Sequence, residues 1–182
     1  KKEPRLFVAD ERLVIFTPTY NESANIEPLY RRIKALKLDA DILLLDDNSP
    51  DGTGEIMDRL AQQDSRVQVI HRKAKLGIGS AHRNGIQWAL DRGHTHFISL
   101  DADFTHSPED IPRLLEDART NDMVVGSRYL REASLDGWNP LRKLLTRTPH
   151  ILTTVLLGLK YDSTGAFRIY RLDRLPRGFL NA

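Results

Sequence analysis

The stretch FISLDADFTHSPEDIP, residues 97–112, indicates what kind of fold this chain adopts. Its first four residues form an apolar run that is too short and too continuously hydrophobic for a surface helix, so they predict a buried β-strand. Two carboxylates, Asp101 and Asp103, follow at once. On extended backbone, side chains two positions apart point to the same side, where two carboxylates can hold one divalent cation. The stretch therefore predicts a strand that ends in an acidic metal site.

The same alternation of short apolar runs and helical patterns extends along the chain. Apolar residues recur at helical spacing within residues 26–36, 56–61, 81–89 and 111–118. This order predicts an α/β fold, an open and mostly parallel sheet with helices on both faces. The expected strands, read as buried parallel strands, are Leu13–Phe16, Ile42–Leu45, Val67–Ile70, Phe97–Leu100 and Met123–Val125.

The composition limits the classes of protein that this chain can belong to. Its 182 residues, 40% of them hydrophobic, suffice for one buried core, so we expect a single domain over residues 1–182. The net charge of +2 gives no case for nucleic-acid binding. The lack of cysteine excludes disulfides and thiolate chemistry, and no apolar run reaches the ~20 residues of a membrane-spanning helix. We expect a soluble or peripheral protein.

Polar clusters follow four of the expected strands. In open α/β sheets, ligands bind outside the carboxyl ends of the strands, so these clusters are the candidate binding residues. The clusters are Thr17–Glu22, Asp46–Thr53, Asp101–Thr105 and Gly126–Tyr129.

The second cluster supports two interpretations. Asp51–Thr53 is explained equally well by a turn with Thr53 as the cap of the next helix. Asp46 and Asp47 are adjacent acids at the end of a buried strand, where they repel one another and add little to packing. A functional role is therefore favoured for these two.

The acid pair of the third cluster favours a metal site. Ser107 is expected to cap the following helix with Pro108 at its first position, which explains the residues after the pair but not Asp101 and Asp103. A Mg²⁺ or Mn²⁺ ion there would have few protein ligands, and phosphate oxygens and water would complete its coordination.

Two basic segments also have alternative interpretations. Arg72–Lys75 is read mainly as a solvated loop, with a phosphate-facing role as the alternative. Residues 142–159, which contain Arg142, run from basic to apolar. They predict either an amphipathic helix on the core or an interfacial element, with cations toward anionic head groups and apolar residues toward acyl chains.

Five segments in order resemble one known family over about residues 13–171. They are Thr17–Glu22 (TPTYNE), Asp46–Thr53 (DDNSPDGT), Asp101–Asp103 (DAD), Gly126–Tyr129 (GSRY) and Asp162–Arg168 (DSTGAFR). Together they resemble the inverting family 2 glycosyltransferases of GT-A fold, in particular the polyprenol-phosphate (dolichol-phosphate) mannose synthases. The resemblance implies a nucleotide-sugar site at the carboxyl ends of the strands.

The resemblance also implies how the chain is divided. Residues from about 10 to 126 would bind the nucleotide, and residues from about 127 to 182 would face the acceptor. Relatives continue with a further strand–helix segment, so we expect either a chain truncated at its C-terminus or a shortened member of the family. The residues that the resemblance assigns to the nucleoside are Pro18, Tyr20, Glu22, Leu45 and Asp47.

The resemblance assigns the metal and the diphosphate to Asp101, Ala102 and Asp103. Thr105 stands where many relatives carry a glutamine as a further metal ligand, so it is the third expected ligand. Arg128 and Arg142 match positions that handle phosphate groups in the family.

The chemistry of sugar transfer agrees with these assignments. A metal ion on Asp101 and Asp103 would neutralise the leaving diphosphate. We expect in-line attack by a polyprenyl phosphate with inversion, with Arg128 and Arg142 holding the acceptor phosphate. Asp162 is the expected base if the acceptor is instead a hydroxyl.

The expected partners follow from this resemblance. GDP-mannose is the preferred donor, with a UDP-linked glucose or amino sugar as the alternative. A polyprenyl (dolichyl or undecaprenyl) phosphate acceptor places the protein peripherally at the cytoplasmic face of a membrane. Whether a membrane protein supplies missing contacts stays open.

Two readings from other classes of protein remain. Residues 97–105 also fit the hhhhDxDxT signature of haloacid-dehalogenase-type phosphatases, with Asp101 as nucleophile and Asp103 as general acid. That motif usually opens such a domain, and the later acidic metal motif is missing. The other reading is a non-catalytic nucleotide-sugar binder.

Overall fold

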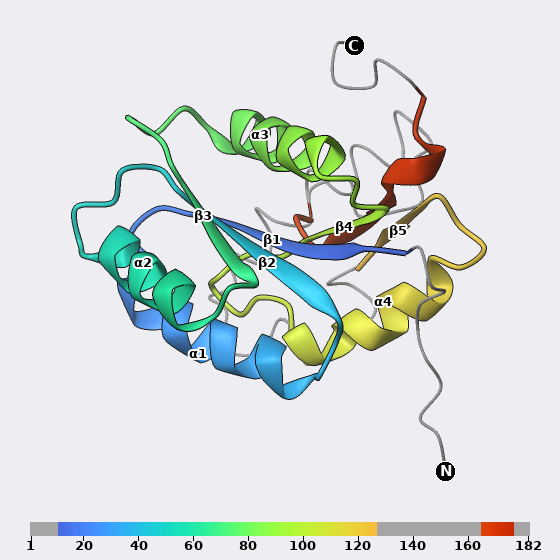
Figure 1. The fold of residues 1–182 in the computed structure, drawn as a ribbon, viewed down its shortest axis with the longest axis horizontal. Coiled ribbons are helices and arrows are strands. Elements are labelled where there is room, and N and C mark those ends of the chain that lie inside the picture. The colour runs from blue at the N-terminus through green and yellow to red at the C-terminus, as the bar shows by residue number, and fades with distance from the viewer. Residues whose placement is uncertain (1–10, 127–164, 177–182) are drawn as a thin grey trace, which may run out of the picture.

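A single mixed sheet forms the centre of the computed structural model, which describes residues 11–126 and 165–176 of the chain. It has six strands in the order β3-β2-β1-β4-β6-β5 and crosses the middle of the molecule in Figure 1. The strands are β1 (Leu13–Thr19), β2 (Ala40–Asp46), β3 (Val67–His71), β4 (His96–Ser99), β5 (Met123–Val125) and β6 (Arg168–Arg171).

The sheet is parallel over β3, β2, β1 and β4, which confirms the predicted α/β fold with a mostly parallel sheet. All five predicted strands are present. Reading Met123–Val125 as a buried parallel strand was wrong, because β6 inserts between β4 and β5 and pairs antiparallel with both. Met123 is 41% exposed at the end of the sheet order. No apolar run in the sequence predicted β6.

The helices lie where the apolar periodicity predicted them, but the predicted cap at Thr53 was wrong. Thr53 is the first residue of its helix, and Gly52 occupies the cap position with φ of 88°. Ser107 occupies the cap position directly before Pro108, as predicted, but its side chain makes no capping hydrogen bond. Its hydroxyl donates to Glu109, and a 3₁₀ turn opens the segment. The elements are α1 (Ser23–Ala35), α2 (Thr53–Gln63), α3 (Ile78–Asp91), η1 (Pro108–Asp110), α4 (Ile111–Asp117) and η4 (Leu172–Arg174).

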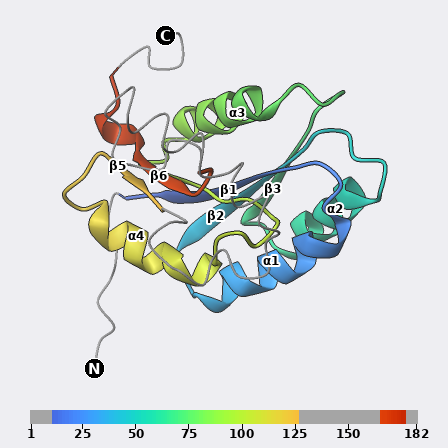
Figure 2. The same cartoon turned by 180° about the vertical axis from the view of Figure 1, so that it is seen from behind.

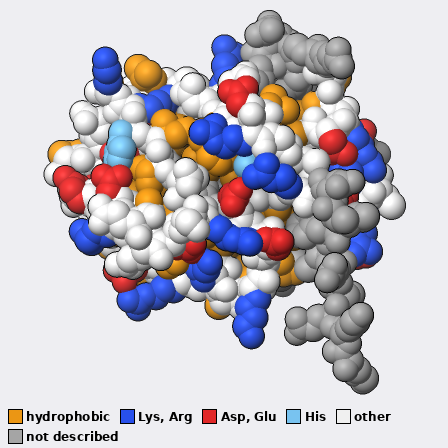
Figure 3. Space-filling model, viewed as in Figure 1, with side chains coloured by type: hydrophobic (Ala, Val, Ile, Leu, Met, Phe, Trp, Pro, Cys, Tyr) orange, Lys and Arg blue, Asp and Glu red, His pale blue; other side chains and the backbone are white. Residues whose placement is uncertain are grey.

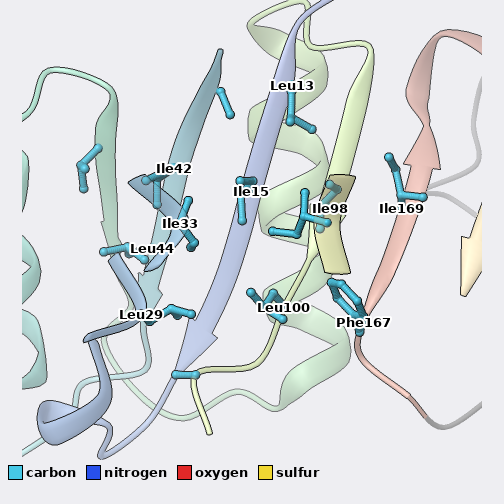
Figure 4. Packing of buried hydrophobic residues seen from close by; sticks show 14 of the residues in the cluster. Leu13, Ile15, Leu29, Ile33, Ile42, Leu44, Ile98, Leu100, Phe167 and Ile169 are labelled. Atoms are coloured by element: carbon cyan, nitrogen blue, oxygen red, sulfur yellow. The ribbon is translucent and has the colours of Figure 1, made fainter. Parts of the chain in front are cut away.

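Helices cover both faces of the sheet, as Figures 1 and 2 show. Successive side chains of a strand point to opposite faces, and β1 follows this rule. Leu13 and Ile15 pack in the cluster with α1, α2 and α4, whereas Val14 and Phe16 pack in the cluster with α3. Figure 4 shows the first cluster, in which side chains from neighbouring strands meet those of α1. Burial on both faces explains the continuous apolar runs.

The backbone of helix α3 at Gly85 packs against the ring of Phe16 from β1. A Cβ atom at Gly85 would lie 2.7 Å from Cε2 of Phe16, so a glycine is needed for this approach. The Phe16 ring also packs against Phe97 of β4, with 5.2 Å between centroids. This packing fixes the two strands that carry the candidate site.

Within residues 11–126 and 165–176, no helix has the length and apolar character needed to cross a membrane.

Candidate active site

The loops after β1, β2, β3 and β4 meet at one edge of the sheet, because these strands run in the same direction. Backbone amides of the first loop donate to side chains of the second. Asn21 N–H donates to Ser49 Oγ (2.9 Å), and Glu22 N–H donates to Thr53 Oγ1 (2.9 Å). The structure therefore brings the predicted nucleoside-binding segments together and cross-links them.

Two of the acids in the second loop serve to hold that loop. The buried carboxylate of Asp46 accepts hydrogen bonds from the backbone N–H and hydroxyl of Ser49. Asp51 accepts from the N–H of Ser23 and from the N–H and hydroxyl of Thr53. Desolvation, the largest influence on Asp51, raises its pKa, but these hydrogen bonds together outweigh it and lower the pKa to about 2. The turn interpretation of Asp51–Thr53 is confirmed, without Thr53 as the cap.

Asp47, the third acid, forms a buried ion pair with Arg72 from the loop after β3. Arg72 donates through Nε and Nη2 to the two carboxylate oxygens of Asp47, and the Nη2–Oδ2 distance is 2.5 Å. It also donates to Ser80 Oγ (2.5 Å) and to the carbonyl of Gly77 (3.2 Å). Arg72 is thus not solvated, contrary to the preferred reading of the basic loop.

The pairing of Asp47 and Arg72 was missed at the sequence level, although a signal existed. Asp46 and His71 are register partners at the ends of β2 and β3. Each residue of the ion pair is the next one along its strand. An acid and a base that follow register partners at one sheet edge are placed to meet.

The other predicted nucleoside residues differ in exposure. Tyr20 is exposed, and the Lys75 ammonium lies 4.0 Å from the centroid of its ring. Pro18 and Glu22 are half-buried. The side chain of Leu45 is fully buried against α3, so a contact with a ligand there would have to come from its backbone.

The acidic turn after β4 has a different backbone from the one expected. Ala102 and Asp103 lie in a turn and Phe104 has φ of 58°, so the premise of extended backbone through the acid pair was wrong. Asp103 is exposed and accepts from the N–H (2.9 Å) and hydroxyl (2.7 Å) of Thr105. Asp101 is half-buried, and Ala102 is buried. Thr105 therefore orients the Asp103 carboxylate.

An arginine of α1 supports the segment that follows this turn. Arg32 donates to the Glu109 carboxylate and to Ser107 Oγ (2.9 Å), and its guanidinium lies 4.9 Å from the centroid of Phe104. The hydrogen bonds from Arg32, followed by those from Ser107, lower the pKa of Glu109 to about 2. No pattern in the sequence pointed to Arg32.

Two of the motifs that carried the resemblance meet next to His106, which follows the acidic turn. The His106 ring packs on Phe167, with 5.1 Å between centroids, and the Gly126 N–H donates to the Phe167 carbonyl (2.8 Å). A Cβ atom at Gly126 would lie 2.3 Å from Cδ1 of Phe167, so only glycine fits this contact. The start of GSRY and the TGAFR segment are therefore packed together.

A half-buried histidine, His82, contacts the buried Ser99 just before the acidic turn. Nδ1 of His82 lies 2.9 Å from the Ile78 carbonyl and must carry a proton to donate to it. Nε2 then accepts from the hydroxyl of Ser99, the last residue of β4, at 2.7 Å. Burial lowers the pKa of His82 and so favours this neutral form.

Three predicted site residues, Arg128, Arg142 and Asp162, lie outside the described residues, as does the basic-then-apolar segment 142–159. Their roles stay predictions.

The donor set of the acidic turn suits a hard divalent cation. Carboxylate and hydroxyl oxygens are ligands that Mg²⁺ and Mn²⁺ prefer. Each Asp103 oxygen accepts from Thr105 and has a second lone pair to offer. Within residues 11–126 and 165–176, no cluster of three or more His, Asp or Glu side chains could hold a metal. Most ligands of such an ion would thus come from phosphate and water.

Comparison with known proteins identifies the class of protein. Residues 14–177 match the model of glycosyl transferase family 2, and the chain belongs to this family. The predicted family and enzyme class are confirmed. The haloacid-dehalogenase reading was wrong, because DxD here follows β4, the fourth strand of a glycosyltransferase domain.

Two curated relatives and one solved structure are similar to this chain. The undecaprenyl-phosphate mannosyltransferase of Micrococcus luteus is 39% identical over 165 residues, 90% of this chain and 68% of that protein. The polyprenol monophosphomannose synthase of Mycolicibacterium smegmatis is 36% identical over all of this chain and 69% of that protein. The mannosyltransferase PcManGT from Pyrobaculum calidifontis, solved with GDP-Man and Mn²⁺, shares the fold (TM-score 0.51, 20% identity, 66% of this chain and 37% of that one).

Proposed function

We propose that this chain transfers mannose from GDP-mannose to a polyprenyl phosphate, with a divalent cation held at Asp101 and Asp103. The observation that carries the proposal is the meeting of the acidic turn after β4 with the cross-linked loops after β1 and β2 at one edge of a family 2 fold. The names of both relatives support the sugar and the lipid acceptor. The ligands of PcManGT support the donor and the metal.

The donor half of the reaction uses residues that the structure describes. Tyr20 and the Asp47–Arg72 pair would hold the nucleoside between the loops after β1, β2 and β3. Asp101 and Asp103 would hold a Mg²⁺ or Mn²⁺ ion, which would supply the positive charge that a departing diphosphate needs. Thr105 would keep the Asp103 carboxylate in place through its two hydrogen bonds.

The acceptor half needs little proton transfer. A lipid monophosphate has its second pKa near ~6, so it is already a dianion at neutral pH and requires no general base. Arg128 and Arg142 would bind this phosphate beside the anomeric carbon. Asp162 would act as a base only for a hydroxyl acceptor. The lipid acceptor supports a peripheral place at the cytoplasmic face of a membrane.

Calorimetric titration of the chain with GDP and with UDP, each with and without Mn²⁺, tests the donor side. We expect Mn²⁺-dependent binding of GDP that the Asp101→Asn/Asp103→Asn variant loses. Asp91→Asn is the matched control, because Asp91 is an exposed acid at the far end of α3. A preference for UDP would leave the chain a glycosyltransferase but contradict GDP-mannose as the donor.

Incubation with radiolabelled GDP-mannose and undecaprenyl phosphate, followed by organic extraction, tests the reaction itself. We expect a lipid-linked mannose. GDP binding without a lipid-linked product under any metal condition would contradict the proposed transfer and favour a nucleotide-sugar binder.

A further inference from the structure

Seven consecutive exposed residues, 73–79, cover most of the loop between β3 and α3 and the first two residues of α3, and this segment is here called the tip loop. It carries the two most exposed large hydrophobic side chains of the described residues, Leu76 (64%) and Ile78 (58%). Single exposed apolar residues need no explanation, but two together at the end of a projecting loop do. In Figure 3, basic and hydrophobic side chains lie side by side at the upper left, where Figure 1 places this loop.

The charge of the tip loop has one sign. No acidic residue occurs from Arg72 to Leu90. Asp47 neutralises Arg72, which leaves Lys73 and Lys75 as the cations of the exposed tip. Two lysines beside two exposed aliphatic side chains match the chemistry of an anionic bilayer surface, with head groups for the ammonium groups and acyl chains for the apolar ones.

Hydrogen bonds within the protein prepare the tip loop for burial. The hydroxyl of Ser80 contacts the carbonyls of Leu76 and Gly77, both at 2.8 Å. Arg72 also donates to the Gly77 carbonyl, and the His82 ring donates to that of Ile78. A backbone carbonyl that enters an apolar layer without a donor is strongly destabilised. These three carbonyls already have donors, so the side chains of the tip can enter a bilayer interface.

The tip loop adjoins the candidate site. Lys75 packs over Tyr20 of the loop after β1, and Arg72 at the base of the tip loop binds Asp47 of the loop after β2. A surface that receives the tip loop would thus face the sheet edge where the sugar donor is proposed to bind.

We propose that the tip loop docks on anionic membrane, with Leu76 and Ile78 in the interface and Lys73 and Lys75 against lipid phosphates. The docked tip loop holds the sheet edge at the bilayer, where a lipid phosphate acceptor resides. The choice of a membrane as the partner rests on the proposed function, but the docking itself is measured without any substrate.

Flotation of the chain with phosphatidylglycerol vesicles and with phosphatidylcholine vesicles tests the docking. We expect binding to the anionic vesicles that falls about tenfold or more in Leu76→Ser/Ile78→Ser and several-fold in Lys73→Gln/Lys75→Gln. The matched control is Leu90→Ser/Met123→Ser, since these exposed apolar residues lie at the other end of α3 and at the other edge of the sheet. Equal flotation of the serine variant at the tip and the control, or no flotation of the parent chain, would overturn the proposal.

A second measurement locates the contact. Since the chain has no cysteine, Leu76→Cys and Met123→Cys can each be labelled at a single position with a polarity-sensitive fluorophore. We expect a blue shift with anionic vesicles at position 76 and none at 123. A shift at 76 that instead depends on protein concentration without vesicles would indicate a second copy of the chain as the partner and contradict membrane docking. We expect Leu76→Ser/Ile78→Ser to bind GDP as the parent chain does. Unchanged GDP binding would show that a loss of flotation does not come from damage to the donor site.

Discussion

The two acidic loops of the candidate site look alike in sequence but differ in what their carboxylates do. In the loop after β2, Asp46 and Asp51 accept hydrogen bonds from their own loops, and Asp47 is buried against Arg72. In the turn after β4, Asp103 is exposed, and each of its two oxygens accepts one hydrogen bond from Thr105. The difference lies in burial: Asp46 and Asp47 are buried among partners within the protein, whereas the exposed Asp103 carboxylate can still contact a ligand.

Replacement of Asp103 by asparagine tests this contrast on the ligand side. We expect mannosyl transfer to fall by roughly a thousandfold, because the cation that neutralises the diphosphate would lose a ligand. The midpoint of thermal unfolding should hardly change, since Asp103 is exposed. Product formation and calorimetric unfolding measure the two effects. A large loss of stability would mean that Asp103 is structural and would break the comparison.

Replacement of Arg72 tests whether the Asp47–Arg72 ion pair supports the structure of the site. Arg72→Met leaves the buried Asp47 carboxylate without its cation, and we expect the free energy of unfolding to fall by about 3 kcal/mol. Denaturant titration measures this loss. Asp47→Asn in the same background should restore part of it, because the unpaired buried charge is removed. If Arg72→Met and Asp47→Asn, each made alone, are as stable as the parent, the ion pair does not support the fold.

Gly126→Ala tests the packing beneath the acidic turn. The added Cβ would overlap the Phe167 ring, which contacts His106, so we expect a loss of about 1–3 kcal/mol in stability. Phe167→Leu in the Gly126→Ala background should restore part of the loss by making room. Equal stability of Gly126→Ala and the parent in denaturant titration would show that the backbone yields at this contact.

The smallest expected effect concerns the pH dependence of the Arg32–Glu109 pair. Because the folded-state pKa of Glu109 is lowered to about 2, the pair stabilises the fold above the ordinary glutamate pKa of 4.5. This contribution is lost as the pH falls from about 4.5 toward 2. Since the pair is exposed, we expect Glu109→Gln to lower stability by only about 0.5 kcal/mol at neutral pH.

Parallel unfolding curves of the parent and Glu109→Gln at neutral pH and near pH 2 measure this difference. The control is Glu27→Gln, which removes an exposed ion pair on α1, the helix that carries Arg32. A difference that stays constant down to pH 2 would contradict the charged role of Glu109.

Much of the fold followed from local patterns in the sequence. Continuous apolar runs such as Ile42–Leu45 are typical of strands buried on both faces, and the 3.6-residue periodicity predicted the four α-helices of the described residues. Pairing, by contrast, depends on residues far apart. Strand β6 follows β5 by more than 40 residues and still inserts beside β4, which no local pattern encodes.

The sequence by itself determined the family, the order of the first five strands along the chain and the acidic segments after two of them, because these depend on residue type and spacing. Only the tertiary structure decided which acids form ion pairs with distant arginines. Asp47 pairs with Arg72, 25 positions away, and Glu109 pairs with Arg32, 77 positions away. The tertiary structure alone showed that Leu76 and Ile78 project together. Ion pairs and exposed clusters form between separate elements, so they exist only once the sheet has set those elements side by side.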